Sequence, residues 1–114
     1  MEPSVLEAIS SPRKREILRL MWKDEQPAGA IHRAMPDITF GAVSLQLRWL
    51  LERDLVEVRH DQRNRFYKAR RAAFGAAASI LESMWDDALG RLKVAAELEE
   101  ARRGPKPRRK KSKK

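Results

Sequence analysis

The spacing of hydrophobic residues along the first third of the chain predicts three short helices. Residues 4–9, 12–23 and 28–35 each carry apolar side chains that recur three or four positions apart, the spacing of one face of a helix. Ser11-Pro12 is typical of a helix N-terminus, because proline has no N–H that the first turn would leave unpaired. These segments are therefore expected to pack their apolar faces into one small core.

A fourth helix is predicted over residues 39–53, with Thr39 as its N-cap. Val43, Leu47 and Leu50 recur at helical spacing and define the face that should be buried. The opposite face and its flanks carry small, apolar and hydrogen-bonding side chains instead. The pattern indicates a helix with one side against the core and the other available to a partner.

After Leu55 the period of the pattern changes from 3.6 residues to two. Residues 56–60 and 65–69 alternate in polarity around a short polar connection, which is typical of a β-hairpin. Asp54 lies where helices often end in a left-handed residue, a conformation that Asp tolerates better than most side chains.

Residues 71–101 are predicted to form a last, long helix with a continuous apolar stripe. A core this small cannot cover about thirty residues of one-sided helix. Burying a large apolar side chain fully is worth about 1.5–3 kcal/mol, so self-association of this helix is expected. The domain is expected to span residues 1–101, followed by a disordered polybasic tail over residues 102–114.

Charge is distributed unevenly along the chain. The net charge is +9, but residues 102–114 contain nine Lys and Arg and no acid, which leaves 16 of each sign in residues 1–101. Within that part, residues 48–71 hold eight basic and four acidic side chains, and residues 76–101 hold two basic and six acidic ones. One end of the domain should therefore attract phosphate and the other repel it.

Composition also excludes several classes of function. The sequence contains no cysteine, which rules out disulfides, thiolate metal sites and cysteine nucleophiles. It has no activating context for a Ser/His/Asp set and no Gly-rich phosphate loop, so no enzyme activity and no cofactor are expected. No apolar run approaches the ~20 residues of a membrane span, so a cytoplasmic, nucleoid-associated protein is expected.

The predicted elements are, in order, three helices, a further helix, a basic hairpin and a long apolar helix. This is the order of elements in a winged helix-turn-helix, a mainly α fold. The major groove of DNA is wide enough for one helix, so the helix over residues 39–53 is interpreted as the recognition helix. Arginines of the hairpin suit the DNA backbone or minor groove. The residues expected to contact DNA are Thr39, Ala42, Ser44, Leu45, Gln46, Arg48, Arg59, Arg63 and Arg65.

Two segments of the chain carry a family resemblance. Residues 11–18 are Ser-Pro-Arg-Lys-Arg-Glu-Ile-Leu, which is similar to the Asp-Pro-x-Arg-Arg-x-Ile-Leu of the ArsR family of bacterial transcriptional repressors. Residues 43–50 with Leu55-Val56 are similar to its Val-Ser-x-His-Leu-x-x-Leu and Gly-Leu-Val. Gln46 replaces the family's histidine and Asp54 its glycine.

The resemblance implies a homodimer that joins its first and last helices and binds a pseudo-palindromic operator. The interface residues expected on these helices are Val5, Leu6, Ile9, Leu81, Trp85 and Leu92. A small-molecule effector of unidentified chemistry is a further expected partner. The family's metal sites are not expected, because there is no cysteine and the last helix offers Asp87, Glu97 and Glu100 without a histidine.

Two other functions fit the same sequence. In the first, the basic tail dominates and the protein is a nonspecific, nucleoid-type DNA binder. In the second, the winged helix is a protein-interaction module. The tail itself is interpreted as a nonspecific DNA arm, with a merely solubilising end as the alternative.

Overall fold

The computed structural model describes residues 2–87. The chain divides into two units, Met1–Leu81 and Glu82–Lys114; in the second, residues 82–87 are described and are helical. The first unit ends in the helical residues 77–81. Its other elements, in chain order, are α1 (Pro3–Ser10), α2 (Pro12–Leu20), β1 (Gln26–Pro27), α3 (Ala28–Ala34), α4 (Phe40–Glu52), β2 (Val56–Asp61), β3 (Asn64–Ala69) and the 3₁₀ helix η1 (Arg71–Phe74). This order is that of the predicted winged helix-turn-helix.

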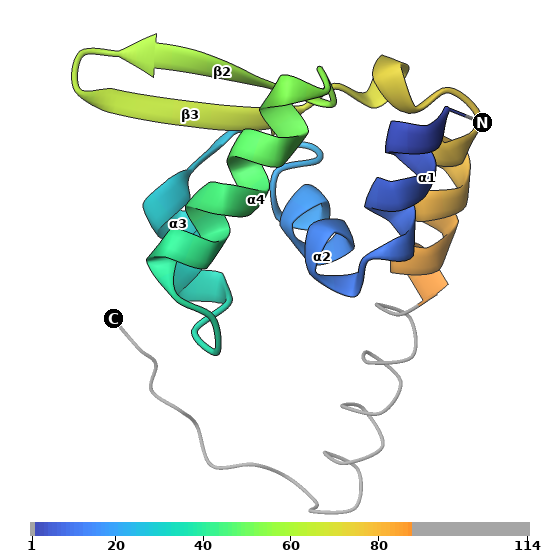
Figure 1. Ribbon diagram of the computed structural model, residues 1–114, viewed down its shortest axis with the longest axis horizontal. Helices are drawn as coiled ribbons and strands as arrows, with labels where there is room; N and C mark the ends of the chain where they lie inside the picture. The colour runs from blue at the N-terminus through green and yellow to red at the C-terminus, as the bar shows by residue number, and fades with distance from the viewer. Residues whose placement is uncertain (1, 88–114) are drawn as a thin grey trace, which may run out of the picture. The chain divides into compact units, whose positions relative to one another are not determined.

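The sheet has three antiparallel strands in the order β1-β3-β2. The predicted hairpin is confirmed, with β2 paired to β3 from Val56↔Ala69 to Asp61↔Asn64, and it extends beyond the helices (Figure 1). The short strand β1 pairs with the other edge of β3, with Gln26 opposite Tyr67. This strand was not predicted, because two residues are too few to show an alternating pattern. Proline is tolerated in β1 because this is an edge strand.

Side-chain caps and one left-handed residue set the helix boundaries. The hydroxyl oxygen of Ser11 accepts a hydrogen bond from the backbone N–H of Lys14 at 3.2 Å, as its position predicts. Asp54 has a φ of 58°, the expected left-handed conformation. The chain then turns so that the N–H of Leu55 donates to the carbonyl of Leu50 at 3.0 Å and the N–H of Arg70 to that of Leu55 at 2.9 Å. These bonds fix the base of the hairpin against the end of α4.

Two predicted helix boundaries are wrong. The helix α2 ends at Leu20 rather than near Lys23, and Met21 and Trp22 are buried in the turn that follows. The helix predicted to begin at residue 71 begins at residue 77, because the chain passes through η1 and then through Gly75. Gly75 has a φ of 56° and a ψ of −134°, a conformation that interrupts any helix and favours glycine.

The core of the first unit is built from apolar side chains of every helix and of the sheet. The apolar faces predicted for the individual segments converge there. Its largest fully buried side chains are Ile17, Leu18, Met21, Ile31, Leu47, Leu50, Leu55, Leu81 and Val43. The rings of Trp22 and Phe74 meet edge to face with centroids 5.3 Å apart, which joins the turn after α2 to η1. Leu92 and residues 102–114 lie outside the described residues.

Candidate nucleic-acid interface

The helix α4 begins at a side-chain cap. The Oγ1 atom of Thr39 accepts a hydrogen bond from the backbone N–H of Ala42 at 3.0 Å, which satisfies one of the free N–H groups of the first turn. Thr39 is exposed and Ala42 is half-buried. The predicted contact residue Thr39 therefore already uses its hydroxyl oxygen to start the helix.

The two faces of α4 differ as the sequence predicted. Val43, Leu47 and Leu50 are buried. Ser44, Leu45 and Arg48 are exposed and form what we call the outer face of α4. The side chain of Leu45 is 62% exposed, although it is large and apolar. An exposed leucine beside an exposed arginine and a hydroxyl can make apolar contacts, charged contacts and hydrogen bonds with one ligand.

Gln46 lies on a flank of α4 and is half-buried. Its Oε1 atom is buried and accepts no hydrogen bond from any side chain or backbone group of residues 2–87. The carbonyl end of this side chain is therefore turned away from solvent. Among the residues predicted to contact DNA, Gln46 is therefore the one whose side-chain oxygen is buried within the chain.

The tip of the hairpin is basic. Gln62 and Arg63 form the two-residue turn between β2 and β3, and Gln62 has a φ of 60°. Positive φ at the first turn residue is typical of type II′ hairpins. Arg63 and Arg65 are exposed, and neither forms an ion pair within the described part of the chain. Both charges are thus available to an anionic ligand.

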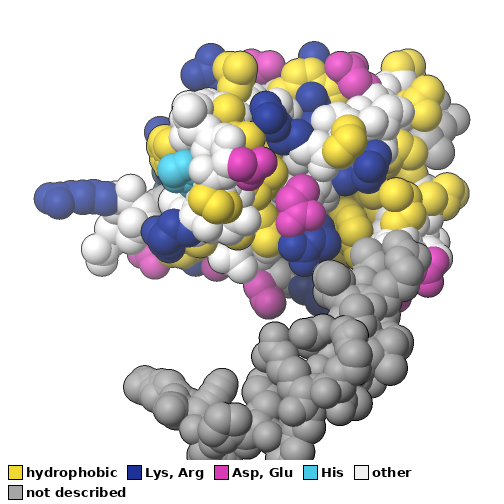
Figure 2. All heavy atoms as spheres, turned by 90° about the horizontal axis from the view of Figure 1, so that it is seen from below, with side chains coloured by type: hydrophobic (Ala, Val, Ile, Leu, Met, Phe, Trp, Pro, Cys, Tyr) yellow, Lys and Arg dark blue, Asp and Glu magenta, His cyan; other side chains and the backbone are white. Residues whose placement is uncertain are grey.

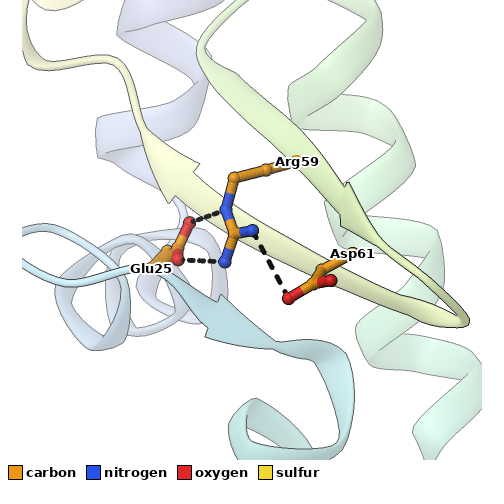
Figure 3. A network of polar contacts seen from close by, with 3 residues as sticks. All are labelled: Glu25, Arg59 and Asp61. Carbon is orange, nitrogen blue, oxygen red and sulfur yellow. Dashed lines mark hydrogen bonds and ion pairs between the residues drawn. The ribbon is translucent and has the colours of Figure 1, made fainter.

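Arg59, in the middle of β2, differs from these two arginines. Its Nε and one terminal nitrogen donate to the two carboxylate oxygens of Glu25 at 3.0 and 2.6 Å (Figure 3). The Asp61 carboxylate lies 3.8 Å away, and the guanidinium stands 4.7 Å above the Phe66 ring. The hydrogen bond from Arg59 lowers the pKa of Glu25, and the same bond raises the pKa of Arg59. Glu25 precedes β1, so this pair connects the loop after α2 to the hairpin.

Three residues that the sequence did not single out as contacts lie together at the C-terminal end of α4. The Lys14 Nζ atom lies 4.6 Å from the centroid of the Trp49 ring, and the Arg53 guanidinium carbon lies 4.0 Å from it. Arg53 also donates to the Trp49 carbonyl at 3.1 Å. We call this group the Trp49 cluster. The only sequence signal for it is the four-residue spacing of Trp49 and Arg53, because Lys14 comes from α2.

A second aromatic group lies at the other end of α4. Phe40, its first residue, is 49% exposed and meets the ring of His32 edge to face, with centroids 5.8 Å apart. Together with Leu45, it gives the N-terminal half of α4 two large exposed apolar side chains.

The residues predicted for the dimer interface differ in how far the structure exposes them. Val5 and Leu81 are 2% and 0% exposed within the single chain, so the prediction that they face a partner is wrong as the fold places them. Leu6 is 53% exposed and Ile9 is half-buried. Trp85 belongs to the second unit, and Leu92 lies outside the described residues.

Figure 2 shows one side of the molecule, on which basic, acidic and apolar side chains are interspersed.

Within residues 2–87, no three His, Asp or Glu side chains gather in a way that could hold a metal ion. The same residues include no helix with the length and apolar character needed to cross a membrane.

Solved structures of DNA-binding regulators resemble this fold. An ArsR-like transcriptional regulator from Rhodococcus sp. RHA1 is 30% identical with a TM-score of 0.60, and the match covers 85% of this chain and 91% of that one. A homodimeric winged helix-turn-helix DNA-binding domain from Mycobacterium bovis is 23% identical with a TM-score of 0.61, covering 77% and 81%. The transcriptional repressor BigR from Xylella fastidiosa is also 23% identical with a TM-score of 0.61, covering 73% and 81%.

No protein-family model matches the sequence, and no curated protein matches it. The likeness at 30% identity extends over nearly the whole of the Rhodococcus regulator. The likeness to the other two structures is one of fold.

Proposed function

This chain belongs to the ArsR family of winged helix-turn-helix transcriptional regulators, and we propose that it is a repressor that binds a specific pseudo-palindromic operator as a homodimer. The observation that carries this proposal is the outer face of α4, where Leu45 and Arg48 are exposed on a helix whose other side is buried. BigR, which has the same fold, is a transcriptional repressor.

In the proposed complex, α4 enters the major groove with its outer face toward the bases. Arg48 donates two hydrogen bonds to a guanine, the commonest specific contact in this groove, and Leu45 packs on a thymine methyl group. Ser44 donates to a base or a phosphate. These three side chains supply the sequence preference.

The hairpin supplies affinity rather than sequence preference. Arg63 and Arg65 have no carboxylate partner among the described residues, so each is available to a phosphate of the adjacent backbone. Arg59 was predicted to act in the same way, but its guanidinium is engaged by Glu25. We propose that Arg59 acts on DNA indirectly, by holding the hairpin in place.

The family and the exposed apolar surface of α1 support the proposed homodimer. The related domain from Mycobacterium bovis is homodimeric. Leu6 remains 53% exposed on α1, and Ile80 is 49% exposed near the end of the first unit. We propose that these side chains, with Ile9 and the last helix, meet a second copy. Two recognition helices related by a two-fold axis would then read half-sites about 34 Å apart.

Selection of bound duplexes from a random library tests this function directly. The purified protein is expected to enrich a palindromic sequence whose half-sites lie one helical turn apart. A parallel selection uses a chain that lacks residues 104–114. Enrichment of no sequence by either protein would contradict the proposal. Loss of nearly all binding in the shortened chain would instead support a nonspecific binder that depends on its basic tail.

A further inference from the structure

The Trp49 cluster brings two positive charges to one aromatic ring from two different helices. Lys14 comes from the first turn of α2, and Arg53 is the C-cap residue of α4. Their distances of 4.6 and 4.0 Å from the Trp49 centroid place the two charges closer together than the Debye length of about 10 Å at 0.1 M salt. Salt therefore weakens their repulsion but does not abolish it.

Acidic side chains compensate this repulsion only weakly. Lys14 forms no ion pair with any carboxylate in residues 2–87, and Arg53 has only Glu52, at 3.8 Å and with a side chain that is 64% exposed. The ring attracts both cations through its negative face but carries no charge. Two cations that share one ring without a close carboxylate favour an anion beside them.

The position of the cluster indicates which anion. Leu45, Trp49 and Arg53 are spaced four residues apart on α4, so the cluster continues along the helix from the outer face and turns gradually toward α2. When the outer face of a recognition helix points at the bases, its flanks face the sugar–phosphate walls of the groove. Arg13, next to the half-buried Lys14, is exposed.

We propose that Lys14 and Arg53, both held against the Trp49 ring, bind a phosphate of the DNA backbone. This inference rests on the proposed function, because it takes α4 as the recognition helix. It adds a contact from α2 to the contacts from α4 and the hairpin. The half-buried indole limits the movement of both side chains before DNA arrives, so less of their freedom is lost on binding.

The salt dependence of binding tests the contact. Lys14→Gln and Arg53→Gln are compared with the unmodified protein on the selected operator and on a scrambled duplex. Each variant should bind both duplexes more weakly by the same factor. The slope of log affinity against log salt concentration should become shallower by about 0.9 when a phosphate contact is lost. Lys14→Gln is the cleaner variant, since Arg53 also caps α4.

Arg19→Gln is the matched control, because it removes one positive charge from the same helix. Arg19 is already paired with Glu16, with Nε 3.1 Å from the carboxylate oxygen, so its loss should leave the slope unchanged. A slope for Lys14→Gln equal to that of Arg19→Gln would overturn the proposal. Circular dichroism checks that all variants are folded.

Fluorescence supplies a second readout that a purely structural role would not change. The difference in emission between the unmodified protein and Trp49→Phe reports Trp49 apart from the other two tryptophans. Adding the operator should change this difference spectrum, and the change should be smaller in Lys14→Gln. An unchanged spectrum would overturn the inference. The function itself fails on a different result, the absence of any preferred duplex.

Discussion

The outer face of α4 and the β2–β3 hairpin are both exposed, yet their chemistry is different. The outer face combines Leu45, Arg48 and Ser44, three side chains that make three kinds of contact. The hairpin carries arginines, of which Arg63 and Arg65 are unpaired within residues 2–87 and Arg59 is bound to Glu25. Varied chemistry can distinguish one base from another, whereas charge alone distinguishes only DNA from neutral ligands. The comparison also shows that arginines a few residues apart need not share a role.

The largest effect is expected from a substitution in the core, because the outer face of α4 and the hairpin both depend on the packing of α4. Leu50→Ala removes a fully buried side chain from the inner side of α4, at the point where the hairpin begins. The free energy of unfolding should fall by about 2–5 kcal/mol, because the change loses burial and leaves a cavity. Urea unfolding followed by circular dichroism measures it.

Leu45→Ala is the matched control, since it makes the same change on the opposite side of the same helix. Leu45 is 62% exposed, so the free energy of unfolding should change by less than about 0.5 kcal/mol. Comparable destabilisation by the two substitutions would contradict the assignment of inner and outer faces.

Arg48→Ala separates the outer face from the hairpin. Loss of a two-pronged contact with one base pair should weaken binding to the selected operator by about 1–3 kcal/mol. A duplex changed at that base pair should bind the variant and the unmodified protein with a much smaller difference. Fluorescence anisotropy on both duplexes gives the comparison, and equal losses on the two would place Arg48 on a phosphate instead.

Arg63→Ala should have the opposite signature. The variant should bind the operator and a scrambled duplex more weakly by the same factor, with the salt slope shallower by about 0.9. Titrations at four or more salt concentrations measure this. If sequence preference changed while the slope did not, the tip of the hairpin would be reading bases.

The smallest effect is expected at the Glu25–Arg59 pair. Arg59→Glu should weaken binding, and adding Glu25→Arg should recover most of the loss because the pair is rebuilt with its charges exchanged. Glu7→Arg with Arg59→Glu has the same net charge without the pair, since Glu7 is exposed on α1. If this control recovers as much affinity as the exchanged pair, Arg59 contacts DNA directly.

The same pair predicts a dependence on pH. The pKa of Glu25 is lowered by its hydrogen bond from Arg59, so its contribution to stability is present above the ordinary glutamate pKa. That contribution is lost as the pH falls through the lowered pKa. Carboxyl NMR titration should place Glu25 below an ordinary glutamate, and Arg59→Gln should remove the shift.

Local patterns predicted the elements of the fold but not the contacts between distant residues. Periodicity identified α4 and the hairpin, and the position of Thr39 predicted its cap, because these features depend on residues close to one another in the sequence. The Glu25–Arg59 pair joins residues 34 positions apart, and Lys14 reaches Trp49 from another helix. Only the packed chain brings them together.

The dimer residues show the same limit. An apolar stripe shows that a side chain avoids water, but it does not show whether the covering surface belongs to the same chain. Val5 and Leu81 are covered by their own chain, whereas Leu6 is not. The interface is therefore expected to be centred on fewer residues of α1 than the stripe suggested.

Gly75 has a consequence for the variation that this protein can accept. A Cβ atom built at this position would meet no atom within 4 Å beyond the neighbouring residues of the chain, so lack of room for a Cβ is not what restricts the position. The restriction comes from its own backbone angles, which every residue with a Cβ adopts only under strain. Saturation mutagenesis should therefore find alanine as poorly accepted there as far bulkier residues, a pattern unlike that of a glycine kept for want of room.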